Sequence, residues 1–384
     1  MRILIGLTLI LAFMSFFLDG AQVEKIEKRI ENGVEVIVNH LQPYKVNGLP
    51  LKVTLKAENA IDLDKFEETI AIIGDLDADK TGNIYLLDVK YQKIVVLNKK
   101  GEFLSEFGRE GQGPGEFRSP LRIRLNRANQ IVITDPLNRK FSFFQTNGKF
   151  IKDIRFTPSA SEGIILDKEN GNFVFKKFEF PTSKTGNIKI LLQLYDAGFN
   201  EIKTLDEMEM LSPLGSKLLG IYNTMGVDIA GNTIITGNQE RGYDLSVYNF
   251  SGKLLKRIQK KFEPVSPSED YKKAFIETLG KKYQLVKNKL VFPDALPAFH
   301  QFSTDPEGRL YVMTYERDKN NSGYMVDVFN SDGIFISRFV LKAPPYPKAV
   351  IRVVNNRLYY LYNQESGSQM LEVYKIDWGK GRGA

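Results

Sequence analysis

A strand-rich unit of about 50 residues recurs along this chain, and it constrains the fold more than any other feature. Its clearest copy is residues 107–148, where a glycine-rich loop precedes three apolar runs that are separated by polar turns. A glycine in the last turn marks the period: Gly101 to Gly148 is 47 residues, and Gly148 to Gly252 is 104, or two units of 52. Repeats of this length with about four strands each indicate the blades of a β-propeller.

The number of units and the apolar strands predict a closed ring. Six units can be traced between residues 72 and 374. Strands such as residues 84–88 are almost continuously apolar, which is typical of a sheet covered on both faces. The sixth unit lacks an outermost strand, whereas two predicted strands, at 33–38 and 51–56, precede the repeats. We therefore predict an all-β, six-bladed propeller in which an N-terminal strand completes the last blade and closes the ring.

One interval departs from the period. Gly252 to Gly333 is 81 residues, about 30 more than one unit, which places an insertion at about 263–299, between blades 4 and 5. The sequence Ser-Pro-Ser-Glu at 266–269 is a helix-start pattern with Ser266 as the cap. Apolar residues then recur at helical spacing as far as a terminating glycine. We expect a short helical insertion.

The same region carries the chain's excess of positive charge. The formal net charge is +7, and residues 253–289 account for all of it. Two interpretations are open. The helix packs over one blade and exposes a solvated lysine face, or it makes peripheral contact with an anionic surface of the cell envelope. The lysines that such a contact would use are Lys272, Lys273, Lys281 and Lys282.

The N-terminus has the plan of an export signal. Arg2 precedes an apolar run at 3–18, which is shorter than the roughly 20 residues of a membrane span. We expect residues 1–20 to be a secretory signal peptide or an uncleaved N-terminal anchor, and residues 21–384 to be an extracytoplasmic propeller, periplasmic or secreted. The chain has no cysteine, so disulfides, thiolate metal sites and cysteine nucleophiles are excluded.

Residue types that most catalytic sites need are scarce. The only histidines are His40 and His300, whereas a catalytic zinc site usually has three protein ligands, mostly His or Cys. No Gly-x-Ser-x-Gly elbow of a serine hydrolase is present. The alternating acids Asp75, Asp77 and Asp79 lack the glycine that follows the third acid of an EF-hand. We interpret them as a turn rather than a calcium loop, and we predict no metal and no cofactor.

Ligands of propellers usually bind at one mouth of the central channel, where loops from several blades meet. In the predicted units these loops are rich in arginine. Guanidinium groups favour an anionic or carbohydrate ligand that is held by charge-assisted hydrogen bonds; an ordinary polar rim is the alternative. The candidate ligand-binding residues are Arg109, Arg118, Asp135, Arg139, Arg241, Tyr243, Asp294, His300 and Arg317.

Residues 107–148 resemble the NHL-repeat propellers. The residues that carry this likeness are Gly111, Gly113, Pro114, Gly115 and Phe117 of a Gly-x-Gly-Pro-Gly-x-Phe loop, then Pro120, Asp135, Asn138, Arg139, Asn147 and Gly148. The whole chain is similar to secreted bacterial six-bladed propellers of uncharacterised function, whose opening Gly-Val-Glu-Val-Ile pattern stands at 33–37. The resemblance implies fold and compartment only, because propellers host many functions. Turn chemistry explains the glycine-rich loop, with Gly115 at positive φ, and a phosphate cradle does not.

These observations favour a non-catalytic propeller, a monomer, that binds an unknown ligand or protein partner outside the cytoplasm. The alternative is a carboxylate- or calcium-dependent hydrolase or lyase acting at the channel mouth, similar to lactonase or sugar-acting propellers. Some NHL domains bind nucleic acid, but such a partner does not fit an exported chain. Acids clustered around one point of the channel would favour the enzyme.

Overall fold

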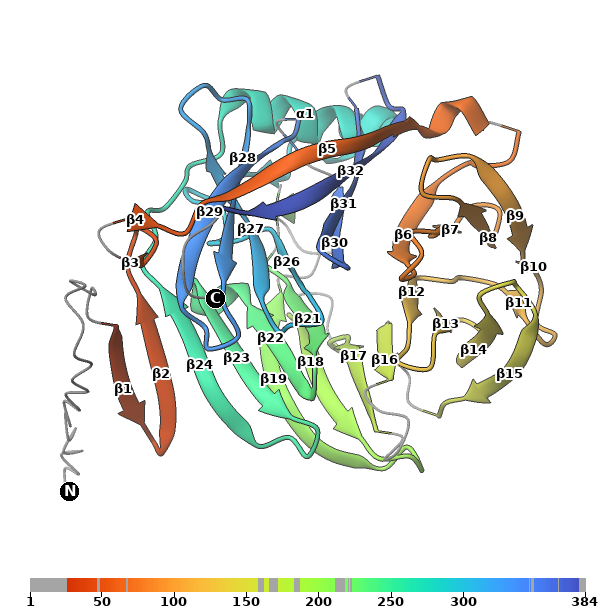
Figure 1. The fold of residues 1–384 in the computed structure, drawn as a ribbon, viewed down its shortest axis with the longest axis horizontal. Coiled ribbons are helices and arrows are strands. Elements are labelled where there is room, and N and C mark those ends of the chain that lie inside the picture. The colour runs from red at the N-terminus through yellow and green to blue at the C-terminus, as the bar shows by residue number, and fades with distance from the viewer. Residues whose placement is uncertain are drawn as a thin grey trace.

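The computed structural model is an all-β propeller of six blades, as predicted (Figure 1). It describes residues 26–46, 49–66, 68–157, 162–165, 172–182, 187–210, 218–219, 221, 223–344, 346, 349–364 and 366–379. The predicted signal peptide or anchor at 1–20 lies outside these residues. No helix within the described ranges is long and apolar enough to cross a membrane.

Blades 1 to 3 follow one another along the chain, each as four antiparallel strands. Their strands are β6 (Ile73–Ala78), β7 (Ile84–Asp88), β8 (Lys93–Leu97) and β9 (Phe103–Phe107); β12 (Arg122–Leu125), β13 (Gln130–Asp135), β14 (Lys140–Gln145) and β15 (Phe150–Arg155); and β16 (Glu162–Ile165), β17 (Phe173–Glu179), β18 (Ile188–Tyr195) and β19 (Glu201–Met210).

Blades 4 to 6 repeat this plan, and the first strands of blades 4, 5, 6, 1 and 2 contact one another in this order around the axis. The strands are β21 (Met225–Ala230), β22 (Thr233–Asn238), β23 (Asp244–Asn249) and β24 (Leu254–Lys260); β26 (Gln301–Thr304), β27 (Leu310–Arg317), β28 (Gly323–Phe329) and β29 (Phe335–Lys342); and β30 (Ala349–Val354), β31 (Arg357–Asn363) and β32 (Gln369–Trp378). Shorter elements are η1 (Leu63–Phe66), β10 (Arg109–Glu110), β11 (Glu116–Phe117), β20 (Leu218–Leu219), η2 (Gln239–Arg241) and β25 (Leu290–Val291).

An N-terminal strand closes the ring, which confirms the prediction. Strand β5 (Val53–Asp62) pairs antiparallel with β32 and is the fourth strand of blade 6. The closure therefore joins both ends of the repeat region in one sheet, and it leaves no gap between the first and the last blade.

The earlier predicted strand lies in a different blade. Strands β1 (Glu27–Glu31) and β2 (Val34–Asn39) form a hairpin, and β2 pairs in parallel with β24, so blade 4 has six strands. The chain then passes blade 5 through β3 (Lys45–Val46) and β4 (Leu49–Pro50) before it reaches blade 6 (Figure 1).

Asn39 holds this passage against blade 5. Its side chain donates to the carbonyl of Gly333 (3.0 Å) and accepts from the backbone N–H of Phe335 (2.7 Å). The N–H of Tyr44 donates to the carbonyl of Phe335 (2.7 Å). The N-terminal segment thus contacts blades 4, 5 and 6 in turn.

The apolar strands pack face to face between blades. Residues Ile84–Asp88 are all buried: Ile84 and Leu86 pack toward blade 6, and Tyr85 and Leu87 pack toward blade 2. Both faces of each sheet are covered in this way, which explains why the strands read as continuous apolar runs.

The glycine-rich loop is built as a closed turn. Gly115 has φ +70° as predicted, and strands β10 and β11 pair in parallel across the loop. The Nζ of Lys140, which is completely buried, donates to the carbonyl of Gly113 (2.7 Å) and pairs with the carboxylate of Asp153 (2.8 Å). These contacts of the buried Lys140 side chain therefore fix the loop to blade 2.

The insertion is helical, as predicted, but its helix starts slightly later. Helix α1 (Glu269–Leu279) is capped by the side chain of Ser268, which accepts from the N–H of Tyr271, rather than by Ser266. It is followed by η3 (Gly280–Lys282) and α2 (Tyr283–Val286). Tyr271 packs edge-on against Tyr315 of blade 5, so the apolar side of the helix covers the propeller.

Candidate functional site

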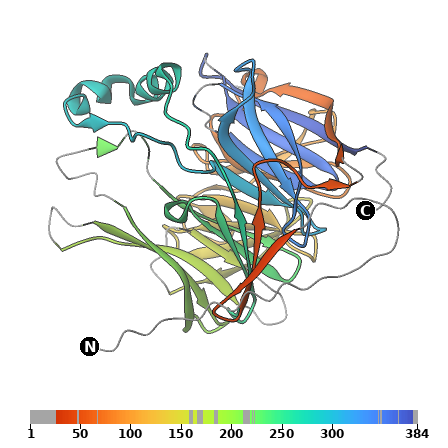
Figure 2. The same ribbon diagram turned by 90° about the vertical axis from the view of Figure 1, so that its left-hand side faces the viewer.

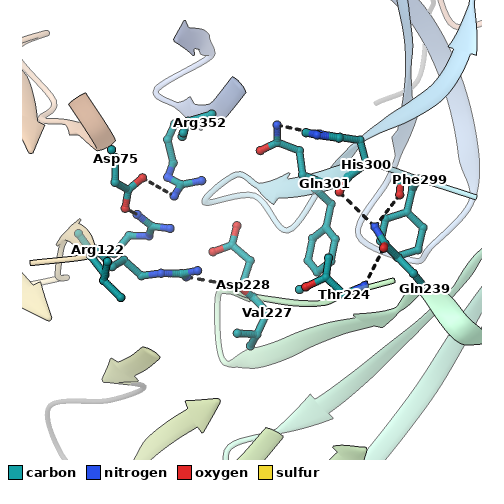
Figure 3. A pocket seen from close by; sticks show the side chains of 16 residues that line it. Asp75, Arg122, Thr224, Val227, Asp228, Gln239, Phe299, His300, Gln301 and Arg352 are labelled. Atoms are coloured by element: carbon teal, nitrogen blue, oxygen red, sulfur yellow. Dashed lines mark hydrogen bonds and ion pairs between the residues drawn. The ribbon is translucent and has the colours of Figure 1, made fainter. Parts of the chain in front are cut away.

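A cavity of about 250 Å³ lies on the axis of the propeller, where the innermost strands of several blades converge (Figure 3). Its lining combines charged, amide and apolar side chains. The lining residues are Gly74, Asp75, Leu121, Arg122, Arg124, Thr224, Gly226, Val227, Asp228, Gln239, Phe299, His300, Gln301, Phe302, Val350 and Arg352.

One side of the pocket is a buried arginine–aspartate cluster. Asp75 on β6 receives the Nη1 of Arg124 from blade 2 (2.8 Å) and the Nη2 of Arg352 from blade 6 (2.7 Å). It also accepts the backbone N–H of Ile123 (3.1 Å). Burial alone would raise the pKa of Asp75, but the charges of the surrounding guanidiniums hold it below its ordinary value. Asp75 is therefore an anion that joins three blades.

The arginines themselves are crowded. Burial, and then the charge of Arg124, lower the pKa of Arg122 to about 9 and lower the pKa of Arg352 as well. The Nε of Arg352 is buried and has no hydrogen-bond partner within the described part of the chain. Among the described lining residues, three guanidiniums face two carboxylates. An anionic group placed here would offset this crowding of positive charge.

Asp228 of the pocket lining and Asp77, which lies outside that lining, hold neighbouring blades together. Asp228 on β21 accepts the N–H (2.9 Å) and the hydroxyl (3.2 Å) of Thr304 in blade 5. Asp77 accepts the N–H of Leu125 in blade 2 (2.8 Å). Burial raises the pKa of Asp77, and the charge of Arg124 only partly offsets it. The carboxylates already have structural partners.

The opposite side of the pocket is formed by amides and aromatic rings (Figure 3). The amide of Gln239 donates to the carbonyl of Phe299 (2.7 Å) and accepts the N–H of Thr224 (2.8 Å). The Nε2 of Gln301 contacts the Nδ1 of His300 (3.2 Å) and donates to the carbonyl of Ala349 (2.9 Å). This side can contact neutral polar groups and apolar surface, and it carries no carboxylate in the described lining.

Of the nine residues predicted from the sequence, His300 lines this pocket. Two others are buried elsewhere. Tyr243 donates its hydroxyl to Asp327 (2.9 Å), and burial raises its pKa well above the ordinary value. Asp135 is completely buried and accepts the backbone N–H groups of Arg118 and Ser119. Both residues have structural partners within the blades.

The remaining six lie near the surface and outside the pocket lining. Arg241 pairs with Asp206 (2.6 Å), and Arg317 stacks over the ring of Tyr324 (4.6 Å). The other four are exposed: Arg109, which pairs with Glu116, and Arg118, Arg139 and Asp294. The structure does not bring the nine together at one mouth, and a ligand-binding role for the outer ones stays a prediction.

The charged residues of the pocket were not predicted as ligand-binding residues, although a signal was present; Asp75 was considered only as one of three alternating acids. Each is flanked by apolar residues in the first strand of its unit, as in Val227-Asp228-Ile229 and Ile351-Arg352-Val353. An ionisable side chain at this position of an otherwise apolar inner strand is costly to bury. Its recurrence in blades 1, 2, 4 and 6 would have pointed to the axis.

The described residues contain no group of three or more His, Asp or Glu side chains that could hold a metal ion. Asp79, the third of the alternating acids, instead accepts hydrogen bonds from Thr81, Asn83 and Tyr85. Asp79 therefore belongs to the predicted turn, whereas Asp75 and Asp77 lie in strand β6, so the prediction that all three acids form a turn was wrong for these two.

The chain is similar to several solved structures over most of its length. The chain is similar to a protein from Bacteroides fragilis NCTC 9343 that is described as exported, with 15% identity, 89% of this chain and 99% of that chain covered, and a TM-score of 0.53. It is also similar to a DUF4221 family member from Bacteroides vulgatus ATCC 8482 (14% identity, 86% and 100% covered, TM-score 0.48). A third is virginiamycin B lyase from Staphylococcus aureus (10%, 84% and 99%, 0.43).

No curated protein matches the chain. A family model does: it matches residues 63–272, more than half of the chain, and its description is a 6-bladed beta-propeller. The matched residues extend from η1 through blades 1 to 4 and into helix α1. With the six sheets and the ring closure already established, the chain belongs to the DUF5128 family of six-bladed β-propellers.

Proposed function

We propose that this propeller is a non-catalytic, extracytoplasmic binding protein whose axial pocket takes a small ligand that bears a carboxylate group. One observation carries the proposal: Arg122, Arg124 and Arg352 converge on a pocket whose described lining contains only two carboxylates. A guanidinium fork suits a carboxylate because it offers two parallel donors to two oxygens.

The remaining lining residues indicate the size and polarity of the part of the ligand beyond its carboxylate group. The volume of about 250 Å³ suits a molecule of small-metabolite size. Phe299 and Phe302 offer apolar surface, and Gln301 offers an amide at the opposite side from the arginines. A hydroxy acid, a sugar acid or an amino acid has this combination of a carboxylate and a compact polar body.

The positions of the acids support binding rather than catalysis. A general base needs a carboxylate within hydrogen-bond reach of the proton that it removes. Asp75 is held between two guanidiniums, and Asp228 holds the backbone of blade 5. Releasing either group for proton transfer would open contacts between blades.

The proposed compartment rests on two further observations. The apolar run at 3–18 behind Arg2 has the plan of a secretory signal. The structurally similar protein from Bacteroides fragilis is described as exported. An extracytoplasmic propeller would meet its ligand in the cell envelope or in the medium.

The test is calorimetric titration of the protein with a panel of hydroxy acids, sugar acids and amino acids, beside the matching neutral sugars and amides. We expect at least one carboxylate to bind and its neutral analogue not to bind. Arg352→Gln should weaken binding by about 10- to 100-fold, since a hydrogen bond to a charged group is lost. Arg155→Gln, at the exposed end of β15, is the matched control. Equal binding of carboxylates by the Arg352→Gln variant would refute the assignment.

A further inference from the structure

The helical insertion ends in a basic tip, residues 280–291, at the same end of the propeller as the pocket. Tyr271 of α1 packs on Tyr315, whose ring in turn contacts His300 of the pocket (5.4 Å between centroids). The strand β25 within the tip pairs with β20, which precedes blade 4. Figure 2 shows the insertion projecting from the ring.

The charge of this tip is one-sided. Residues 280–291 contain four lysines and no acidic residue. Lys281, Lys282, Lys287 and Lys289 are all exposed. Lys272 differs, because it pairs with Glu269 within α1 (2.7 Å). The positive charge is therefore concentrated at the tip and not along the whole helix.

An apolar side chain stands among these lysines. Leu285 in α2 is 82% exposed, the largest exposure among the described large apolar residues. Two other strongly exposed apolar residues lie at the same end of the propeller. Leu137 (62%) comes just after the end of β13, and Phe180 (74%) directly follows β17. Because first and second strands are antiparallel, the second strand of a blade ends at the end of the propeller where the first strand begins. The pocket lies at this end.

We infer that the basic tip docks the propeller on an anionic phospholipid bilayer, with the pocket end toward the membrane. Lysines attract the phosphate groups of the lipid surface, and an exposed leucine between them inserts among the headgroups. A soluble anionic polysaccharide would match the lysines but would give Leu285 no apolar partner. The combination of charge and exposed leucine therefore favours lipid.

Docking in this orientation has a consequence for the pocket. The mouth would open toward the headgroup layer, and the projecting insertion would hold the ring away from the surface on one side. The inference does not depend on the identity of the pocket ligand, and it would stand if the carboxylate proposal failed.

The test is co-sedimentation of the full chain with two kinds of vesicle, pure phosphatidylcholine and phosphatidylcholine mixed with anionic phosphatidylglycerol. The readout is the ratio of the two partition coefficients. An apolar N-terminal segment would bind both kinds alike, so the ratio isolates the effect of lipid charge. We expect a preference for anionic vesicles on the order of 100-fold at low salt, falling steeply as salt is added.

Three variants decide the assignment. Reversing Lys281, Lys282, Lys287 and Lys289 to Glu should bring the ratio close to one, and Leu285→Ser should lower anionic partition by a few-fold. The matched control reverses four exposed lysines in turns at the opposite end, and it should keep the ratio of the parent protein. Those control lysines are Lys99, Lys100, Lys149 and Lys253.

Two results would overturn the inference. One is a parent protein without preference for anionic vesicles, whether or not it binds an anionic polysaccharide. The other is a fourfold tip variant that retains the preference. Circular dichroism of each variant confirms that the propeller is folded before the ratios are compared.

Discussion

The glycine-rich loop and the axial pocket are opposite kinds of site. The loop at 109–117 is conspicuous in the sequence and lies at the outer part of blade 2, where Lys140 and Asn138 donate hydrogen bonds to its backbone carbonyls. The pocket residues are inconspicuous in the sequence, yet Arg352 and Asp75 meet on the axis from blades 6 and 1. A conspicuous sequence motif and a position on the propeller axis are therefore separate properties in this fold.

The reason lies in what each region must achieve. A loop of several glycines satisfies the hydrogen bonds of its own backbone locally, so residues adjacent in the sequence determine its conformation. The charges of the axial cluster are satisfied across blades, so blades 1, 2, 4 and 6 each contribute only one or two charged residues. Variants can sharpen this difference, because a change in the loop should alter stability alone and a change on the axis should alter both stability and ligand binding.

The largest effect is expected for Asp75→Ala. The substitution leaves the guanidiniums of Arg124 and Arg352 buried without their shared anion, and breaking a buried ion pair costs about 3–5 kcal/mol. We expect the free energy of unfolding to fall by about this amount and the binding of carboxylate ligands to change. Denaturant unfolding and calorimetry measure the two effects.

The matched change in the loop region is Asp135→Ala. It removes acceptors for the backbone of Arg118 and Ser119, so stability should also fall, by about 1–3 kcal/mol for the backbone groups left unpaired. Ligand affinity should stay at the parent value. If affinity fell as well, the proposed division between loop and axis would be wrong.

Acid should reveal the ionisation of Asp75. Its pKa in the folded protein is held below the ordinary aspartate value of 3.8, so its ionised form contributes stability that is present above that value and is lost as pH falls through the folded pKa. The raised pKa of Asp77 acts in the opposite direction. We expect Asp75→Asn to be less stable than the parent at pH 7 but to lose less stability on acidification to pH 3. Unfolding midpoints across this range measure the difference, and parallel curves would contradict it.

A loss of stability is also expected for a change directly before the glycine-rich loop. Gly108 has φ +82°, and a Cβ there would lie 2.5 Å from the ring of Phe117. Gly108→Ala should therefore cost about 2–3 kcal/mol from strain and overpacking together. Gly33 has φ +79° but open space around it, so Gly33→Ala should cost only about 1 kcal/mol. Equal losses would show that packing against Phe117 contributes nothing.

The smallest effect is expected for Arg139→Lys. Arg139 is exposed, and its backbone at φ +49° is a feature of the turn and not of the side-chain charge. Neither the unfolding midpoint nor the affinity for carboxylates should change measurably. A loss of affinity for carboxylates would show that Arg139 binds the ligand and that the binding site lies farther from the axis than proposed.

The fold was predictable because its signals are local. The glycines that mark the period, Gly101, Gly148, Gly252 and Gly333, all have positive φ. A residue with a Cβ is strained in that conformation, so the turn chemistry recurs in each blade where the same backbone recurs. The closing strand could be predicted by counting strands, because the sixth unit lacked an outermost strand and two predicted strands preceded the repeats.

The site was less predictable because its residues converge over long separations. Asp75 and Arg352 are 277 residues apart and Asp75 and Arg124 are 49 apart, and no local pattern joins them. The sequence placed ligand contacts in loops between strands, and His300 was found there. The arginines of the pocket lie instead within inner strands, where the apolar residues on either side predicted only a core.

The route of the first strands has a consequence for how the protein is made. Strand β2 leaves the ribosome long before β24, its neighbour in blade 4, and a contact between Asn39 and Gln259 spans 220 residues. In blade 6 the contact between Glu58 and Arg357 spans 299 residues. Strands β1 and β2 can pair with each other at once, but β2 must wait for β24, and β5 must wait for β32. The ring therefore cannot close before β32 has been synthesised, so the end of synthesis sets the moment at which the first and last parts of the chain are joined.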